Sequence, residues 1–245
     1  RLAAEVQLKS TQNELVQAGK LAALGQLSVG ITHEINQPLT AIASYLHTAG
    51  RHLDKAQPDK ARLNIEKMHQ LLDKIAGITR HLKAFAREAG AELSPVLLEP
   101  VILDAIELMS NQIREQNSHL EYQNNVKDLN VLAEPIRLEQ VLVNLISNAV
   151  DALSSAPLKQ IQIAVTEEEK QVLISVSDTG IGIEADKLNQ IFDPFFTQKE
   201  VGQGLGLGLS ISYNIIQDFS GQIRVSSTQG QGSSFTLVLQ KASTK

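Results

Sequence analysis

Ile161-Gln162-Ile163-Ala164-Val165 and Val172-Leu173-Ile174-Ser175-Val176 decide the fold of the second half of this 245-residue chain. In both stretches buried-type apolar residues return at every second position, which is the period of a strand with one buried face. The same period returns at Ile223-Arg224-Val225 and from Phe235 to Leu239. Helical patterns are interleaved with these strands near 100–116, 135–153 and 206–219. The second half is therefore predicted to be an α/β sandwich, with helices covering one face of a mixed sheet.

The first 90 residues follow a helical period instead. Apolar side chains recur every three or four residues in two runs, as on one face of a helix. These runs comprise Leu24, Leu27, Ile31, Ile35, Leu39 and Ile42, then Leu63, Met68, Leu71, Ile75, Ile78, Leu82 and Phe85. Breaks at Gly50 and Gln57-Pro58-Asp59 predict an antiparallel helical hairpin. One hairpin buries two such faces poorly, so we expect two chains to pair as a homodimer with a four-helix bundle.

Composition and charge exclude several classes of protein. The net charge of -5 and the absence of a Lys/Arg cluster argue against a nucleic-acid partner. The chain has no Cys, which rules out disulfides, thiolate metal sites and a cysteine nucleophile. No run approaches the ~18 apolar residues of a membrane span, and the sequence starts at Arg1. We therefore expect a soluble part of a longer protein, joined to a membrane only through an upstream region.

The segment Thr32-His33-Glu34-Ile35-Asn36-Gln37-Pro38 carries the first candidate chemistry. At ~100° per residue, His33 points about 200° away from Ile31 of the apolar run, onto a polar face. An imidazole accepts a phosphoryl group through a nitrogen lone pair, and the adjacent Glu34 carboxylate can fix the tautomer and act as general base. A surface histidine beside a solvated glutamate is the plain alternative. A zinc-protease motif is excluded, because Gln37 stands where that motif needs a second His.

A polar face is expected on the helix predicted at 135–153. Asn144, Asn148 and Asp151 are spaced by four and three residues, which places them on one side of that helix. The opposite, apolar side is formed by Leu138, Leu142, Leu145, Ala149 and Leu153. Asn is a mediocre residue in a helix interior, so this face indicates function slightly more than solvation. One amide oxygen would suit Mg²⁺, which takes few protein ligands and completes its octahedron with water and phosphate oxygens.

A carboxylate and two glycines follow the strand at 172–176, in the segment Asp178-Thr179-Gly180-Ile181-Gly182-Ile183. Asp178 can accept a hydrogen bond from an exocyclic amine there, while Gly180 and Gly182 let the backbone approach a flat ring. A simple turn is the alternative interpretation of this stretch taken alone.

Six of the chain's 15 glycines fall between residues 180 and 208, and four of them precede a predicted helix: Gly202, Gly204, Gly206 and Gly208. Free backbone N–H groups and the helix dipole favour phosphate at a helix N-terminus, so this segment predicts a triphosphate site. It lacks the Gly-Lys-Ser/Thr ending of a P-loop and the position of a dinucleotide fingerprint, which excludes both. Lys199 is a candidate phosphate contact, and a solvated loop lysine is its equal alternative.

Together these motifs resemble the sensor histidine kinases of bacterial two-component systems, over about residues 20 to 240. The resemblance rests on five motifs in the family's order: the phosphoacceptor box at His33-Glu34, the N box at 144–151, the first glycine box at 178–182, the F box at 192–196 and the second glycine box at 202–208. The Asn-Gln-Pro form after the histidine, with Thr-x-Lys before the lid, is similar to the dicarboxylate and nitrogen-regulation sensors.

The resemblance implies a chain of four segments. They are a signalling helix or coiled-coil linker at 1–20, a dimerisation and histidine phosphotransfer domain at 21–90, a linker at 91–95, and a catalytic ATP-binding domain at 96–242. The last belongs to the class shared by gyrase, chaperones, kinases and mismatch-repair proteins (GHKL). By the same resemblance the chain is the cytoplasmic portion of an inner-membrane sensor.

The resemblance also implies a role for each site residue. His33 would take phosphate from ATP and pass it to an Asp of a response regulator, Asn148 would bind Mg²⁺, and Asp178 would contact the adenine amine. The implied ATP-binding set is Asn144, Asn148, Asp151, Asp178, Gly180, Gly182, Lys199, Gly202, Gly204, Gly206, Leu207 and Gly208. Two positions depart from the pattern. Asp151 stands where many relatives have Lys or Arg, and Gln37 stands where Thr or Asn orients water for phosphatase activity, which leaves that activity an open question.

Two other classes share part of this pattern. An ATPase clamp, such as a chaperone or mismatch-repair protein, would have the ATP domain without a helical hairpin carrying His-Glu. A binding-only scaffold would dimerise and sense nucleotide without transfer, and would not need Asn148, Asp178 and the glycine lid together. Residue spacing does not distinguish phosphorylation within one subunit from phosphorylation across the dimer.

Overall fold

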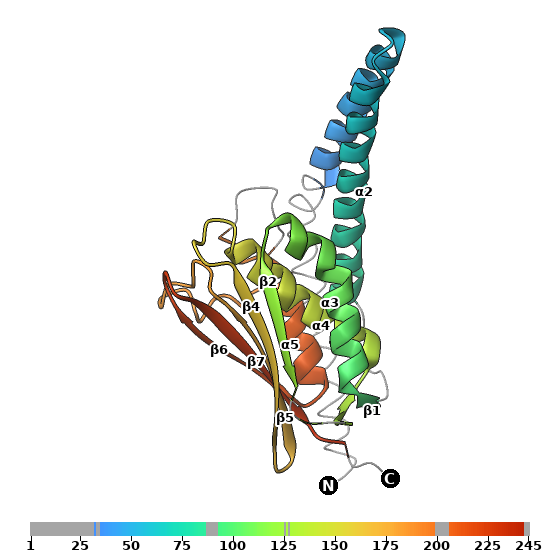
Figure 1. Ribbon diagram of the computed structural model, residues 1–245. Helices are drawn as coiled ribbons and strands as arrows, with labels where there is room; N and C mark the ends of the chain where they lie inside the picture. Colours follow the sequence, from blue (N-terminus) through green and yellow to red (C-terminus); the bar gives the residue numbers. More distant parts are fainter. Residues whose placement is uncertain are drawn as a thin grey trace. The chain divides into compact units, whose positions relative to one another are not determined.

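The computed structural model describes residue 32 and residues 35–86, 93–124, 126, 128–198 and 206–242. These residues divide into two compact units, one helical and one α/β. Figure 1 shows the long paired helices of the first unit and the curved sheet of the second. None of the helices in the described ranges is long and apolar enough to cross a membrane.

The helical unit is the predicted hairpin, and its turn lies beside the second of the two predicted breaks. Gly50 lies inside the first helix, which runs over residues 35–54, so the prediction of a break at Gly50 is wrong. An interior glycine costs a helix only about 1 kcal/mol relative to alanine, so a single one need not end it. The chain turns at residues 55–57, where Ala56 has φ 54°. Pro58 then begins α2 (Pro58–Ala86), at a position where its missing N–H costs nothing.

Small side chains let the two helices of this unit approach closely. Ala49 and Ala61 are 5% and 1% exposed, and Ile78, much further along α2, is also buried. Larger apolar side chains of the same helices remain outside this contact, on the surface of the single chain. The exposed ones are Leu39, Leu46, Leu53, Leu63, Ile65 and Leu72.

The α/β unit is built on a five-stranded mixed sheet in the order β2-β4-β5-β7-β6. Its strands are β2 (His119–Asn124), β4 (Gln160–Glu168), β5 (Gln171–Asp178), β6 (Gln222–Thr228) and β7 (Gly232–Gln240). β2 pairs in parallel with β4, and the remaining pairs are antiparallel. Ile161, Ile163 and Val165 of β4 are buried, whereas Gln160 and Gln162 are exposed, as alternation predicts.

Three helices of the α/β unit, α3 (Leu98–Glu115), α4 (Pro135–Ala152) and α5 (Gly208–Asp218), lie against one face of this sheet (Figure 1). This arrangement confirms the predicted layer architecture. The apolar side of α4 forms much of the core between helices and sheet, since Leu138, Leu142 and Leu145 are at most 1% exposed. Burying such side chains contributes about 2 kcal/mol each before entropy is counted.

A second, two-stranded sheet pairs β1 (Ser94–Leu97) antiparallel with β3 (Asn130–Ala133). β1 therefore begins inside the segment 91–95 that the sequence assigns to a linker. Pro95 is tolerated there because an edge strand leaves some N–H groups outside the ladder. An isolated bridge between Val131 and Lys241 joins this small sheet to the end of the chain.

Candidate functional site

The predicted site residues fall into three groups in the structure. His33, Glu34, Lys199, Gly202 and Gly204 lie outside the described residues. Gln37 is exposed on the first helix of the helical unit. The other predicted residues belong to the α/β unit, where they lie on α4, at the end of β5 and in the two glycine segments: Asn144, Asn148, Asp151, Asp178, Gly180, Gly182, Gly206, Leu207 and Gly208.

Asp178 is the last residue of β5 and is partly buried. Its Oδ1 accepts a hydrogen bond of 2.8 Å from the Gly180 N–H, and the Ser233 N–H of β7 also donates to the carboxylate. Burial raises the pKa of the Asp178 carboxyl above its ordinary value, and these two hydrogen bonds oppose the shift. The carboxylate is thus fixed in place while its exposed remainder can accept a further donor.

The loop after Asp178 packs against the end of α4. A Cβ at Gly180 would lie 2.6 Å from the Ala152 carbonyl oxygen, and the Ile181 N–H donates to that oxygen at 3.2 Å. Gly182 has φ +67°, and a Cβ there would collide with the Thr228 carbonyl oxygen at 2.1 Å. Both glycines are therefore required by the close approach of the Ala152 and Thr228 main chain, whereas their predicted approach to a flat ring stays a prediction.

The second glycine segment ends at the start of α5. Leu207 is buried and Gly208 is the first helical residue, and among the described residues no side chain caps this helix. Its first N–H groups are available for an anion. The Gly206 carbonyl oxygen accepts a hydrogen bond of 3.0 Å from the Phe195 N–H, so residues 195 and 206 lie side by side.

The two asparagines of α4 differ in their surroundings. Asn144 is 7% exposed, and its Nδ2 donates to the Gly208 carbonyl oxygen and to Ser212 Oγ, both at 3.3 Å. Asn148 is half-buried one turn further on, and Asp151 is exposed near the end of the helix. α4 therefore contacts the first turn of α5 through Asn144 and the Asp178 loop through Ala152, with Asn148 between them.

Sequence reasoning missed the contribution of the turn between β6 and β7. Gly232 has φ +112°, and a Cβ there would lie 2.0 Å from the Asp178 carbonyl oxygen. Its neighbour Ser233 is 8% exposed and supplies the second N–H to the Asp178 carboxylate. The Gly230-Gln231-Gly232 spacing in the sequence was the available signal for a tight turn.

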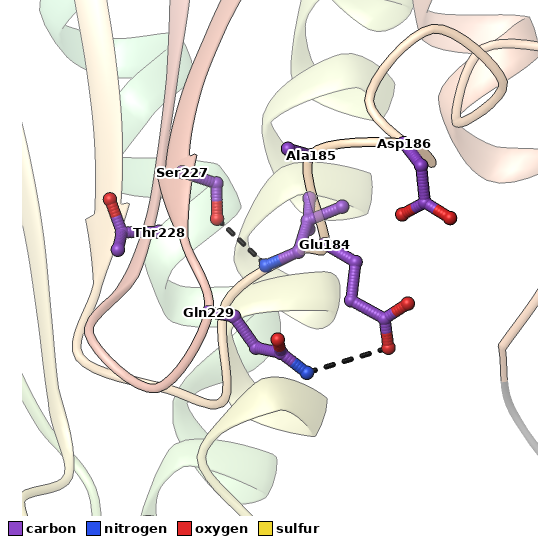
Figure 2. Close-up of a pocket in the computed structure, with 7 residues that line it drawn as sticks. Glu184, Ala185, Asp186, Ser227, Thr228 and Gln229 are labelled. Atoms are coloured by element: carbon purple, nitrogen blue, oxygen red, sulfur yellow. Dashed lines mark hydrogen bonds between the residues drawn. The ribbon is translucent and has the colours of Figure 1, made fainter.

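A surface hollow of about 660 Å³ lies beside this site and does not coincide with it. It is lined by the loop after β5, the end of β6 and the turn that follows, in particular Glu184, Asp186, Ser227 and Gln229 (Figure 2). None of the predicted nucleotide contacts lines it. The candidate site is therefore taken as Asp178, Asn148 and the start of α5, which carry the predicted nucleotide contacts.

Two family models match the chain in the order of its two units. Residues 23–90 match the His Kinase A (phospho-acceptor) domain, and residues 133–243 match the histidine kinase-, DNA gyrase B- and HSP90-like ATPase. The chain belongs to the sensor histidine kinase family. The family prediction from the five motifs is confirmed, and the ATPase match supports the use of ATP.

The dicarboxylate sensors stand among the similar proteins, as the Asn-Gln-Pro segment predicts. The kinase is 40% identical over 225 residues to the C4-dicarboxylate transport sensor protein DctB of Pseudomonas aeruginosa, with 91% of this chain and 36% of that protein covered. It is 37% identical over 235 residues to DctB of Rhizobium meliloti, with 96% and 37% covered. The chain therefore spans little more than a third of these relatives' length.

Solved structures of histidine kinases share the fold. The histidine kinase ThkA, solved in complex with the response regulator protein TrrA, is 27% identical with a TM-score of 0.73, covering 96% of this chain and 67% of that chain. The separate catalytic domain of ThkA is 32% identical with a TM-score of 0.55, covering 62% of this chain and 97% of that domain.

Proposed function

We propose that this kinase transfers the γ-phosphoryl group of ATP to His33 and then to an Asp of a response regulator. The observation that carries the proposal is the position of α4, which contacts both glycine segments and places Asn148 between the Asp178 loop and the start of α5. A nucleotide whose base is bound at Asp178 would have its phosphates near the N-terminus of α5 and near Asn148. The base and the phosphates of one nucleotide would thereby both lie next to α4.

The adenine end of this site is specified by one carboxylate. Asp178 already accepts two backbone N–H bonds, which leave lone pairs for an exocyclic amine. A 6-oxo base such as guanine presents a carbonyl oxygen there instead of an amine. Two acceptors would then face each other without a hydrogen between them, which costs free energy in a partly buried site. The proposed preference for ATP over GTP follows from that mismatch.

The phosphate end suits Mg²⁺ held mainly by the nucleotide. No group of three or more His, Cys, Asp or Glu side chains that could hold a metal occurs among the described residues. The Asn148 amide oxygen is the candidate metal ligand on the face of α4 between the two glycine segments. One such oxygen fits an ion that keeps water and phosphate ligands. When bound, the ion would neutralise charge on the phosphates.

The transfer itself joins a neutral imidazole nitrogen of His33 to the γ-phosphorus while the bond to the β–γ bridging oxygen breaks and ADP leaves. Glu34, adjacent in sequence, would accept the proton of the other ring nitrogen as positive charge develops on the ring. The phosphoryl group then passes from His33 to a carboxylate of the regulator. Gln37, which is exposed and follows His33 by four residues in the sequence, is our candidate for orienting water in the reverse, phosphatase reaction.

We propose further that the kinase acts as a homodimer through its helical unit. Leucines that are about half exposed or more line both helices, for example Leu46 at 63% and Leu53 at 59%, and a second hairpin would bury them. Because ATP and receiver domains occur in the cytoplasm, we place this part of the protein there, with a membrane-bound sensing region upstream.

Transfer to His33 is tested by incubating the chain with γ-labelled ATP and Mg²⁺. Label that is stable in base and labile in acid is expected in the wild type, and it should be lost in His33→Gln and in Asn148→Asp. The matched control is His47→Gln, which removes an exposed histidine from the first described helix and should retain label. Label that persists in His33→Gln would overturn the assignment.

A further inference from the structure

The side chain of Ser227 connects the β6–β7 hairpin to the loop after β5. Ser227 Oγ accepts a hydrogen bond of 2.8 Å from the Ile183 N–H and donates one of 2.8 Å to the Gly232 carbonyl oxygen. The first of these is visible in Figure 2. Ser233 Oγ lies 3.0 Å away, and it is the donor in that pair because the Ser227 hydrogen is already used. One hydrogen and two lone pairs are the full capacity of a hydroxyl, so Ser227 is saturated.

The partners of Ser227 lie on both sides of Asp178. Ile183 follows the two glycines of the loop, whereas the N–H of Ser233 donates to the Asp178 carboxylate. Gly232 lies against the Asp178 main chain, where a Cβ would be 2.0 Å from the carbonyl oxygen. A single hydroxyl thus links the loop that follows Asp178 to the strand that holds its carboxylate.

We propose that Ser227 is a positioning residue for nucleotide binding in this kinase. Its hydroxyl fixes the loop 180–183 relative to the Ser233 donor, and so holds Asp178 in the orientation that accepts the base. Ser227 lines the hollow rather than the nucleotide site, so it acts through Asp178 and not by contact. The inference rests on the proposed nucleotide site.

The fold of the hairpin does not depend on Ser227 alone. β6 and β7 are paired from Gln222 to Thr228, and the Gly230 N–H donates to the Ile181 carbonyl oxygen at 2.7 Å. Removing the hydroxyl leaves these bonds in place and admits water from the hollow to the orphaned groups. We therefore expect the loss to appear in nucleotide affinity more than in stability.

The experiment compares Ser227→Ala with Ser226→Ala, which removes an exposed hydroxyl from the preceding position of the same strand. In Ser227→Ala the Kd for a fluorescent ATP analogue and the apparent KM for ATP in autophosphorylation should rise about five- to thirtyfold, the value of one or two hydrogen bonds. The kcat at saturating ATP should change by less than about twofold. Ser226→Ala should match the wild type in both.

A conservative variant separates positioning from general damage. Ser227→Thr keeps the hydroxyl, and the hollow of about 660 Å³ has room for its methyl group, so its Kd should return to within about threefold of the wild type. A folded Ser227→Thr that binds as weakly as Ser227→Ala, or a Ser227→Ala that binds as the wild type does, would overturn the inference. Asp178→Asn is measured in parallel. If Asp178→Asn keeps its affinity for the ATP analogue, the nucleotide site itself is misassigned. If Asp178→Asn loses affinity while Ser227→Ala binds as the wild type does, only the role of Ser227 is rejected.

Discussion

Gly180 and Ala152 are in contact main chain to main chain, because a Cβ at position 180 would lie 2.6 Å from the Ala152 carbonyl oxygen. The neighbouring Ile181 N–H donates to that oxygen. The loop after β5 is therefore positioned by the last turn of the helix that carries Asn148. A shift of either element moves the proposed base contact relative to the proposed phosphate contact.

The substitution Gly180→Ala should abolish nucleotide binding and lower the free energy of unfolding by about 1–3 kcal/mol, since an added methyl group must displace backbone. Gly230→Ala is the control, because its Cβ meets nothing within 4 Å and only the φ of +79° is unfavourable. It should cost about 1–2 kcal/mol of stability and leave affinity unchanged. Urea unfolding and nucleotide titration measure the two effects, and equal losses of affinity would contradict the explanation.

Asp178→Asn is expected to weaken ATP binding about ten- to a hundredfold, the value of a hydrogen bond to a charged group. The variant keeps an oxygen for the Gly180 N–H, so the loop should stay folded. Its stability at neutral pH should not fall, because the wild-type pKa is raised by burial and the ionised carboxylate is therefore disfavoured in the folded state. A variant that binds ATP normally would contradict the base contact.

The raised pKa of Asp178 also predicts how the stability and the ATP affinity of the protein change with pH. Between the unfolded and folded pKa values the folded state binds more protons, so stability decreases as pH rises through that window and the penalty is absent below it. ATP affinity should change in the opposite sense and weaken as pH falls through the folded pKa, because binding uses the carboxylate. Calorimetric titration across the acidic range tests this in wild type, and Asp178→Asn should remove the contribution of this carboxyl group to both slopes.

The sequence predicts the strands and helices that carry strong periodicity and misses those that do not. β4 and β5 alternate cleanly and are found as predicted. β1 escapes prediction because it has four residues, includes Pro95 and buries only Val96. β2 escapes because its sequence, His119 to Asn124, is polar and lies at the edge of the sheet, where alternation of burial is partial.

The local sequence pattern does not predict the role of a residue whose partners are distant in the sequence. The spacing of Asn144 and Asn148 predicts one shared polar face, yet Asn144 is buried because α5, 64 residues later, packs on it. Gly232 is required by the Asp178 carbonyl oxygen, which belongs to a different strand. The motifs therefore predict which residues gather, whereas tertiary contacts decide which of them support the site and which remain available to a ligand.

Substitutions of the two asparagines of α4 should have different effects, one on stability and the other on nucleotide binding. Asn144→Ala leaves the Gly208 carbonyl oxygen and Ser212 Oγ without their donor in a buried position, and should lower the free energy of unfolding by about 1–3 kcal/mol. Asn148→Ala, from a half-buried position, should cost under about 1 kcal/mol but remove Mg²⁺-dependent ATP binding. Thermal unfolding and titration with and without Mg²⁺ distinguish them. Equal behaviour of the two variants would show that their roles are not divided.

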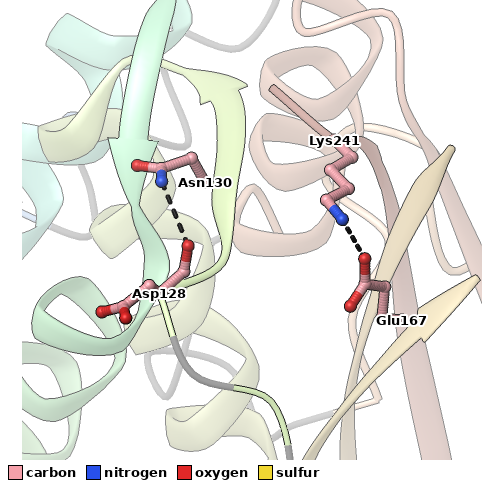
Figure 3. A network of polar contacts seen from close by, with 4 residues as sticks. All are labelled: Asp128, Asn130, Glu167 and Lys241. Carbon is pink, nitrogen blue, oxygen red and sulfur yellow. Dashed lines mark hydrogen bonds and ion pairs between the residues drawn. The ribbon is translucent and has the colours of Figure 1, made fainter. Parts of the chain in front are cut away.

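The last described residues fasten the small sheet to the large one. The Lys241 N–H donates to the Lys170 carbonyl oxygen at 3.0 Å, and the Ala242 N–H donates to the Asn130 carbonyl oxygen at 2.8 Å. Figure 3 shows Lys241 directed at Glu167, and Asn130 donating to the Asp128 carbonyl oxygen. Ala242 is 2% exposed. The backbone bonds and the buried methyl group, more than the ion pair, hold β3 in place.

A chain that ends at Gln240 should therefore lose about 2–3 kcal/mol of stability, from two backbone hydrogen bonds and one buried methyl group. Lys241→Ala is the matched control, because it removes only the ion pair. With the Lys241 side chain 39% exposed, that pair should contribute less than about 0.5 kcal/mol after screening. Denaturant unfolding at low and high salt measures both. If Lys241→Ala costs as much as the truncation, and the loss disappears at high salt, then charge rather than backbone pairing fastens β3 to the sheet.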